Sequence, residues 1–281
     1  MKYHGILKKT YWCEAIMLNE IILFVKFGEE QYIKKLLNGT LHFSNANCFC
    51  RMERENGQKG QGDAFEAVFQ LKIKAGYFID NSTLKKRNYS EERINVVFPN
   101  VLNTPVFCIT GIKRGDCTIS ESGEKRILKI DEEIKKTIKS HFPKADSAGV
   151  FFQPIDFINS FKQLGMFVHD DIHYYNFHID GILENMIKYV SQCPGKINGR
   201  TSYLMKMDCK MDNNEQNTMY ITTQNMHRIL FCKDNYFSKE KEYRIILPQK
   251  SILKPKDYYI GWGSQKRQIY KMDEFFEGIE I

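Results

Sequence analysis

Two glutamates, Glu240 and Glu242, stand one residue apart in the stretch YFSKEKEYRIILP, directly before an apolar run. Alternate residues of an extended chain point to the same side, so both carboxylates are predicted to share one strand face. Carboxylates at the edge of a rigid sheet can stabilise a positively charged transition state, and each raises the proton affinity of the other. The alternative is a structural ion pair with Lys239, Lys241 or Arg244.

A second group of charged residues lies in the glycine-rich stretch RMERENGQKGQGDAFE, which carries Arg51, Arg54, Asp63 and Glu66. An arginine guanidinium can grip a phosphate with two parallel hydrogen bonds, and glycines let the backbone approach a ligand closely. This stretch therefore predicts a mobile, phosphate-binding loop. The alternative is a solvated surface loop that binds nothing.

A third group is the stretch HDDIHYYNFH, where His169, Asp171 and His173 alternate and His178 follows. On a strand the first three would share one face, and two imidazoles with a carboxylate are suitable zinc or iron ligands. In a loop or a helix that alignment is lost. We therefore keep a metal site only as an alternative and assign no metal ligands.

Composition sets the broad class of the chain. The 281 residues are 42% hydrophobic and 13% aromatic, which is typical of a compact globular protein. The formal net charge of +7 is compatible with a polyanionic partner or with a merely solvated surface. The 8 cysteines lack zinc-site spacing, and no secretion signal or spanning segment begins the chain, so a cytoplasmic location without membrane association is predicted.

The elements that position these residues follow from hydrophobic patterns and turn signals. Strands are predicted at residues 21–28, at 40–44, at 104–112 and in EYRIILP. Helices are predicted at residues 29–39, ending at Asn-Gly, and after Asp131, which is a candidate N-cap. Short strands and scattered helices without regular alternation indicate an α+β fold with mixed or antiparallel sheets and flanking helices. We expect one domain over residues 1–281, with residues 165–225 as a candidate inserted subdomain.

Two parts of the sequence together resemble the ADP-ribosyltransferase superfamily, especially the DarT-like enzymes that act on nucleic acid. The stretch LFVKFGEEQYIKKLLNGTLHFSNANCF is similar to the N-terminal strand and helix of that superfamily, which ends in Ile-Leu-x-x-Gly before a short strand. The stretch KEKEYRIILP resembles its last motif, in which a glutamate opens an apolar strand. The resemblance covers about 80 residues and implies an ADP-ribosyltransferase-like core with a middle insertion.

The same two parts resemble an uncharacterised bacterial family often associated with phage defence, which carries a Trp/Tyr-x-x-Glu-x-Glu-Tyr-Arg signature near its end. The resemblance implies that Glu242 is the catalytic carboxylate and that Glu240 orients or activates the acceptor. Lys26 falls where many members have a histidine or arginine that holds NAD. Ser44, Arg51, Arg54 and Asp63 complete the cofactor-binding residues that the resemblance implies, with Arg51 or Arg54 at the pyrophosphate.

The hypothesis is therefore a bacterial toxin or antiviral defence effector, a transferase that uses NAD as substrate and passes ADP-ribose to nucleic acid or protein. A cognate antitoxin or another defence-system component is its expected partner. Two alternatives remain open at this point. One is a non-catalytic module that binds a nucleotide or a phage component, and the other is a metal-dependent nuclease that uses His169, Asp171 and His173.

Overall fold

In the computed structural model, the described part of the chain consists of Leu18 and residues 20–56, 62–80, 85–122, 124–175, 205–210, 216–221 and 226–281. The chain divides into two compact units, each described by itself below. Unit 1 comprises Met1–Ala64, Thr104–Ile172 and Phe237–Ile281, and unit 2 comprises Phe65–Asn103 and His173–Tyr236.

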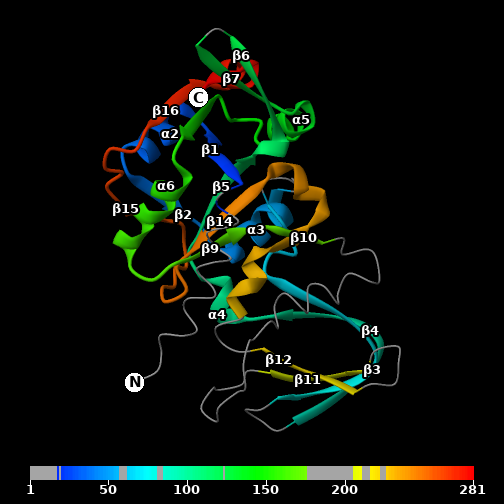
Figure 1. Cartoon of the computed structure of the whole chain (residues 1–281). Coiled ribbons are helices and arrows are strands. Elements are labelled where there is room, and N and C mark those ends of the chain that lie inside the picture. Colours follow the sequence, from blue (N-terminus) through cyan, green and yellow to red (C-terminus); the bar gives the residue numbers. More distant parts are fainter. Residues whose placement is uncertain are drawn as a thin grey trace, which may run out of the picture. The chain divides into compact units, whose positions relative to one another are not determined.

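Unit 1 is built on a six-stranded antiparallel sheet in the order β16-β8-β1-β5-β14-β9 (Figure 1). The strands of this central sheet are β1 (Ile21–Gly28), β5 (Val106–Lys113), β8 (Ser147–Phe151), β9 (Val168–Asp171), β14 (Glu242–Ile246) and β16 (Arg267–Lys271). Its smaller sheets consist of β2 (Thr40–Phe43) with β15 (Lys256–Tyr259), and of β6 (Cys117–Ser122), β7 (Lys125–Ile130) and β17 (Ile279–Glu280).

Helices cover both faces of the central sheet. The helices of unit 1 are α2 (Glu30–Leu37), α3 (Ala46–Asn56), η1 (Arg114–Asp116), α5 (Glu132–His141), α6 (Pro154–Ser160), η2 (Phe161–Leu164) and α9 (Met272–Glu277), and η4 (Asn235–Glu240) ends in it. Figure 1 shows α2 and α6 on one side of β1 and α5 on the other. No helix in the described residues has the length and apolar character needed to cross a membrane.

Unit 2 contains a four-stranded antiparallel sheet in the order β12-β11-β3-β4 and a parallel pair, β10-β13. Its elements are β3 (Val68–Asp80), β4 (Lys85–Val97), α4 (Pro99–Leu102), β10 (His173–Tyr175), β11 (Met205–Lys210), β12 (Gln216–Ile221), η3 (His227–Phe231) and β13 (Cys232–Asp234). Antiparallel sheets with few helices confirm the predicted α+β class.

Two hydrophobic cores define the two faces of the central sheet. The Phe157 core contains Phe24, Phe43, Phe107, Ile109, Phe151, Phe157, Tyr243, Ile245 and Leu247 among its members. The Phe275 core contains Leu23, Val25, Phe27, Ile112, Ala148, Val150, Ile134, Ile138, Phe275 and Phe276 among its members. Successive side chains of a strand point to opposite faces of the sheet. A strand residue that belongs to one core therefore shows that its two neighbours in the strand lie on the opposite face. We call these faces the Phe157 face and the Phe275 face.

The local sequence explains where the elements around the site begin and end. Helix α2 stops at Asn38, and Gly39 has a φ of 93°, a left-handed conformation that suits glycine. Helix α5 begins after Asp131, whose Oδ1 accepts a hydrogen bond from the Glu133 amide at 2.8 Å, as predicted for an N-cap. The sequence does not predict helix α3, because its polar residues from Cys50 onward are typical of a mobile loop.

Candidate functional site

The two glutamates of the opening motif are separated by a turn of the backbone. Glu240 is the last residue of η4, Glu242 is the first residue of β14, and Lys241 between them has a φ of 50°. Alternation requires an extended chain through all three residues, and a left-handed residue interrupts it. The prediction that Glu240 and Glu242 share one strand face is therefore wrong.

Glu242 lies in a buried ion pair. The Arg244 Nε donates to Glu242 Oε1 at 2.5 Å, and the two residues are 1% and 8% exposed. The ring of Phe49, on α3, lies 6.0 Å from the Arg244 guanidinium carbon. Arg244 is one of the three partners that the sequence offers for a structural ion pair, so Glu242 makes the structural contact as well as being the candidate catalytic carboxylate. The pair fixes the orientation of the Glu242 carboxylate.

The strand register shows which residues accompany Glu242. Glu242 lies opposite Thr110 and Arg244 opposite Cys108, and these four residues occupy the Phe275 face because their strand neighbours belong to the Phe157 core. Burial, followed by the charge of Glu242, raises the pKa of the Cys108 thiol. Cys108 therefore stays protonated at neutral pH and is a poor nucleophile. Cys48, Cys50, Cys108, Cys117 and Cys232 are not joined in disulfide bonds.

Glu240 contacts a histidine that the sequence does not mark. His141 Nδ1 lies 2.6 Å from Glu240 Oε1, and the two side chains are 6% and 5% exposed. His141 is the last residue of α5, and its ring also packs edge-on against Phe237 at a centroid distance of 6.0 Å. The two residues are 99 positions apart in the sequence, so no motif joins them. A buried carboxylate and imidazole in contact can hold or pass a proton.

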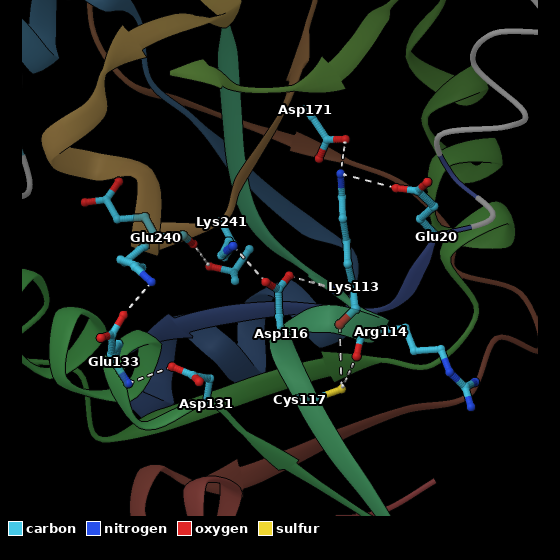
Figure 2. A network of polar contacts seen from close by, with 12 residues as sticks. Glu20, Lys113, Arg114, Asp116, Cys117, Asp131, Glu133, Asp171, Glu240 and Lys241 are labelled. Atoms are coloured by element: carbon cyan, nitrogen blue, oxygen red, sulfur yellow. Dashed lines mark hydrogen bonds and ion pairs between the residues drawn. The ribbon is translucent and has the colours of Figure 1, made fainter. Parts of the chain in front are cut away.

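The neighbouring lysines are occupied elsewhere. Lys239 Nζ pairs with Glu133 at 2.5 Å, and Lys241 Nζ pairs with Asp116 Oδ1 at 2.7 Å. Figure 2 shows Lys241 directed toward Asp116, whose second oxygen accepts the Lys113 backbone amide at 3.0 Å. This network ties η1 and the start of β14 together. Glu240 instead contacts His141, and Glu242 contacts Arg244.

Lys26 does not meet Glu242. Phe24, two residues earlier on β1, belongs to the Phe157 core, so Lys26 occupies the Phe157 face. Its ammonium group donates to the Cys108 backbone carbonyl at 2.7 Å and lies 5.5 Å from the centre of the Phe107 ring. Glu242 occupies the opposite face of the same sheet. The resemblance that grouped these two residues in one site is therefore not matched by their positions.

Ser44, in contrast, lies on the same face as Glu242. Its backbone exchanges two hydrogen bonds with Val106, at 3.0 and 2.8 Å, and Val106 lies opposite Ile246 of β14. Directly opposite residues point to one side, so Ser44 and Ile246 share the face that carries Glu242. Ser44 is 9% exposed, and its hydroxyl oxygen has no hydrogen-bond partner among the described residues.

The remaining cofactor-binding candidates lie on or next to α3. Arg51 and Arg54 are exposed on this helix, and the Arg51 guanidinium donates only to the Cys48 sulfur, at 3.3 Å, among the contacts described. Asp63 is 3% exposed and follows residues 57–61, which lie outside the described part. Phe49 connects the same helix to Arg244, so α3 covers this region of the Phe275 face.

The candidate metal ligands have other contacts. His169 Nδ1 lies 2.6 Å from the Tyr243 hydroxyl, and burial lowers its pKa to about 4. Asp171 accepts the Lys113 ammonium at 2.8 Å (Figure 2), and His173 belongs to unit 2. His178 lies outside the described residues. Within the described ranges, no three His, Cys, Asp or Glu side chains are grouped as metal ligands.

Comparisons with known proteins do not place the chain in a family. Searches against protein-family models, curated proteins and solved structures found no match.

Proposed function

We propose that this protein is an ADP-ribosyltransferase-like enzyme that uses NAD on the Phe275 face, with Glu242 as the catalytic carboxylate. One observation carries the proposal. The two sequence stretches on which the resemblance rests meet across β5, since Ser44 bridges to Val106 and Val106 pairs with Ile246. Ser44, Glu242 and the arginine-bearing helix α3 thereby come to the same face of one sheet.

Cleavage of NAD requires a negatively charged group that stabilises positive charge on the ribose. Cleavage of the bond between ribose C1′ and the nicotinamide nitrogen leaves an oxocarbenium-like ribose, and nicotinamide departs with the bonding electrons. An ionised carboxylate beside C1′ lowers the energy of that cation. The acceptor then bonds to C1′ and gives up a proton, for which the Glu240–His141 pair is the candidate recipient. Arg51, exposed on α3, is suited to the pyrophosphate.

The acceptor is proposed to be nucleic acid or protein, and the biological role to be that of a toxin or phage-defence effector with a cognate partner. The net charge of +7 is compatible with a polyanionic acceptor. Lys26 has no part in this version of the site, because it lies on the other face of the sheet.

A second candidate function is a binding module that recognises a nucleotide without turnover. The Glu242–Arg244 pair favours it, because a carboxylate that is 8% exposed and already paired has less freedom to meet a substrate. A defence-system component that senses a nucleotide would need the same face but no chemistry.

Measuring nicotinamide release from NAD distinguishes the proposed enzyme from the binding module. The proposed enzyme releases nicotinamide, and Glu242→Gln lowers that rate by about 100-fold or more, the usual loss for an essential electrostatic group. The matched control is Glu280→Gln, because Glu280 is exposed and pairs only with the surface residue Lys125 among the contacts described. Melting curves of both variants exclude unfolding as the cause.

A binding module gives a different pattern. NAD or another nucleotide raises the melting temperature of the wild type, no nicotinamide appears, and Arg51→Gln weakens the stabilisation. Wild-type protein that neither releases nicotinamide nor is stabilised by any nucleotide would contradict both functions.

A further inference from the structure

A second polar surface of unit 1 is formed by β15 and the segment that precedes it, where Lys250 and Lys256 contact the ring of Tyr258. The Lys250 ammonium lies 4.8 Å from the centre of the Tyr258 ring, and the Lys256 ammonium lies 5.5 Å from it. A cation over an aromatic face is attracted by the ring quadrupole, but two cations on one ring repel each other. This arrangement concentrates positive charge at one place on the surface.

The segment that carries these lysines is firmly held. Ile252 is 6% exposed and belongs to the Phe157 core, and its carbonyl accepts the side-chain amide of the fully buried Asn45 at 2.6 Å. The Lys250 amide closes a turn on the Leu247 carbonyl at 3.0 Å. Both ammonium groups are thus presented from an ordered backbone, which lowers the entropy cost of binding an anion.

Neither lysine has an acidic partner in the described part of the chain. The acid nearest to them in sequence, Asp257, lies 2.7 Å from His42 Nδ1 across the β2–β15 pair. Lys254, between the two lysines in sequence, is exposed and adds a third positive charge to the segment. A surface with several lysines and no paired carboxylate is complementary to a phosphate-rich ligand.

We propose that Lys250, Lys256 and the Tyr258 ring form a phosphate-binding site. It is separate from the site proposed for NAD, because Tyr258 packs on Phe43 and the Phe157 core, whereas Glu242 occupies the opposite face of the central sheet. The phosphate belongs either to a free nucleotide or to the backbone of a single-stranded nucleic acid. The site does not depend on the proposed chemistry at Glu242.

The test measures binding with charge-matched variants. One double variant is Lys250→Gln/Lys256→Gln. Its control is Lys129→Gln/Lys136→Gln, which removes the same charge from two exposed lysines on β7 and α5, elements that pack on the Phe275 core. The probes are inorganic phosphate, AMP and a fluorescent oligothymidylate of about 20 nucleotides, longer than a single-strand site of about 4 to 16 nucleotides.

We expect wild type and control to bind a phosphate probe and the β15 variant to bind it at least tenfold more weakly. With the oligonucleotide, loss of two contacts lowers the salt slope by about 1.4, at about 0.7 for each phosphate. Lys250→Arg/Lys256→Arg should retain binding. Binding of AMP and phosphate identifies a nucleotide site, whereas binding of the oligonucleotide alone identifies a nucleic-acid site.

Two results would overturn the proposal. One is that wild-type protein binds none of the three probes. The other is that both glutamine double variants lose affinity equally, since binding would then follow net charge and not this site. Nicotinamide release, measured on the same variants, is expected to be unchanged, so a failure here is distinguishable from a failure of the NAD proposal.

Discussion

At the scale of single residues, the environment of each ionisable side chain decides what it can do. His169 shows this most directly, because it is mostly buried between Phe167 and Tyr243, with ring centroids 5.5 and 5.9 Å away. Burial disfavours the imidazolium ion and lowers the pKa to about 4, although the nearby charge of Asp170 opposes the shift. The histidine is therefore neutral at physiological pH.

This shift predicts an acid-sensitive contribution to stability. The ordinary pKa of histidine is 6.5, so between pH 6.5 and about 4 the unfolded chain binds a proton that folded His169 does not. The contribution of neutral His169 to the free energy of unfolding is fully present above pH 6.5. It is lost as the pH falls to about 4, and the loss is about 3 kcal/mol at most. His169→Asn, which cannot titrate, should reduce the loss measured by urea unfolding over this range. Identical pH profiles for both proteins would show that His169 is not buried in this way.

At the scale of elements, the junction between η4 and β14 depends on Lys241. Its φ of 50° is a conformation that costs an L-residue about 1 to 2 kcal/mol, and the Asp116 ion pair helps to retain it. Lys241→Gly and Lys241→Ala both remove the ion pair, but only glycine relieves the backbone strain.

We therefore expect Lys241→Gly to be about 1 kcal/mol more stable than Lys241→Ala in chemical unfolding. Lys239 is the matched control position, because it is not among the residues with positive φ. There the order should reverse, with alanine more stable than glycine. If alanine is more stable than glycine at position 241 as well as at position 239, the left-handed conformation of Lys241 is absent in solution.

The sequence predicts the elements better than it predicts the site. Strands β1, β5 and β14, helix α2 and the Asp131 cap of α5 were predicted from hydrophobic pattern and turn residues, which are local signals. Partners distant in sequence leave no such signal, so the Glu240–His141 contact was missed. The sequence also does not show that Lys26 and Glu242 lie on opposite faces of the sheet, because that depends on the register between their strands.

At the scale of the whole molecule, the central sheet of unit 1 joins two cores. The Phe157 core and the Phe275 core lie on opposite faces, and residues of β1, β5 and β8 contribute to both. Removing a side chain from either core therefore destabilises strands whose residues also form the other core. We therefore expect unit 1 to unfold as one cooperative unit.

Phe157→Ala and Phe275→Ala test this cooperativity, because both rings are 0% exposed, one in each core. Each substitution should cost about 3 to 5 kcal/mol. Native-state hydrogen exchange should show the same loss of protection in either variant across the slowest amides of β1, β5 and β8, since these exchange only when the whole unit opens. If Phe275→Ala weakens protection only at α5 and α9, the cores are independent. The Phe275 face could then open locally, and the site proposed at Glu242 would lie on the less stable side of the sheet.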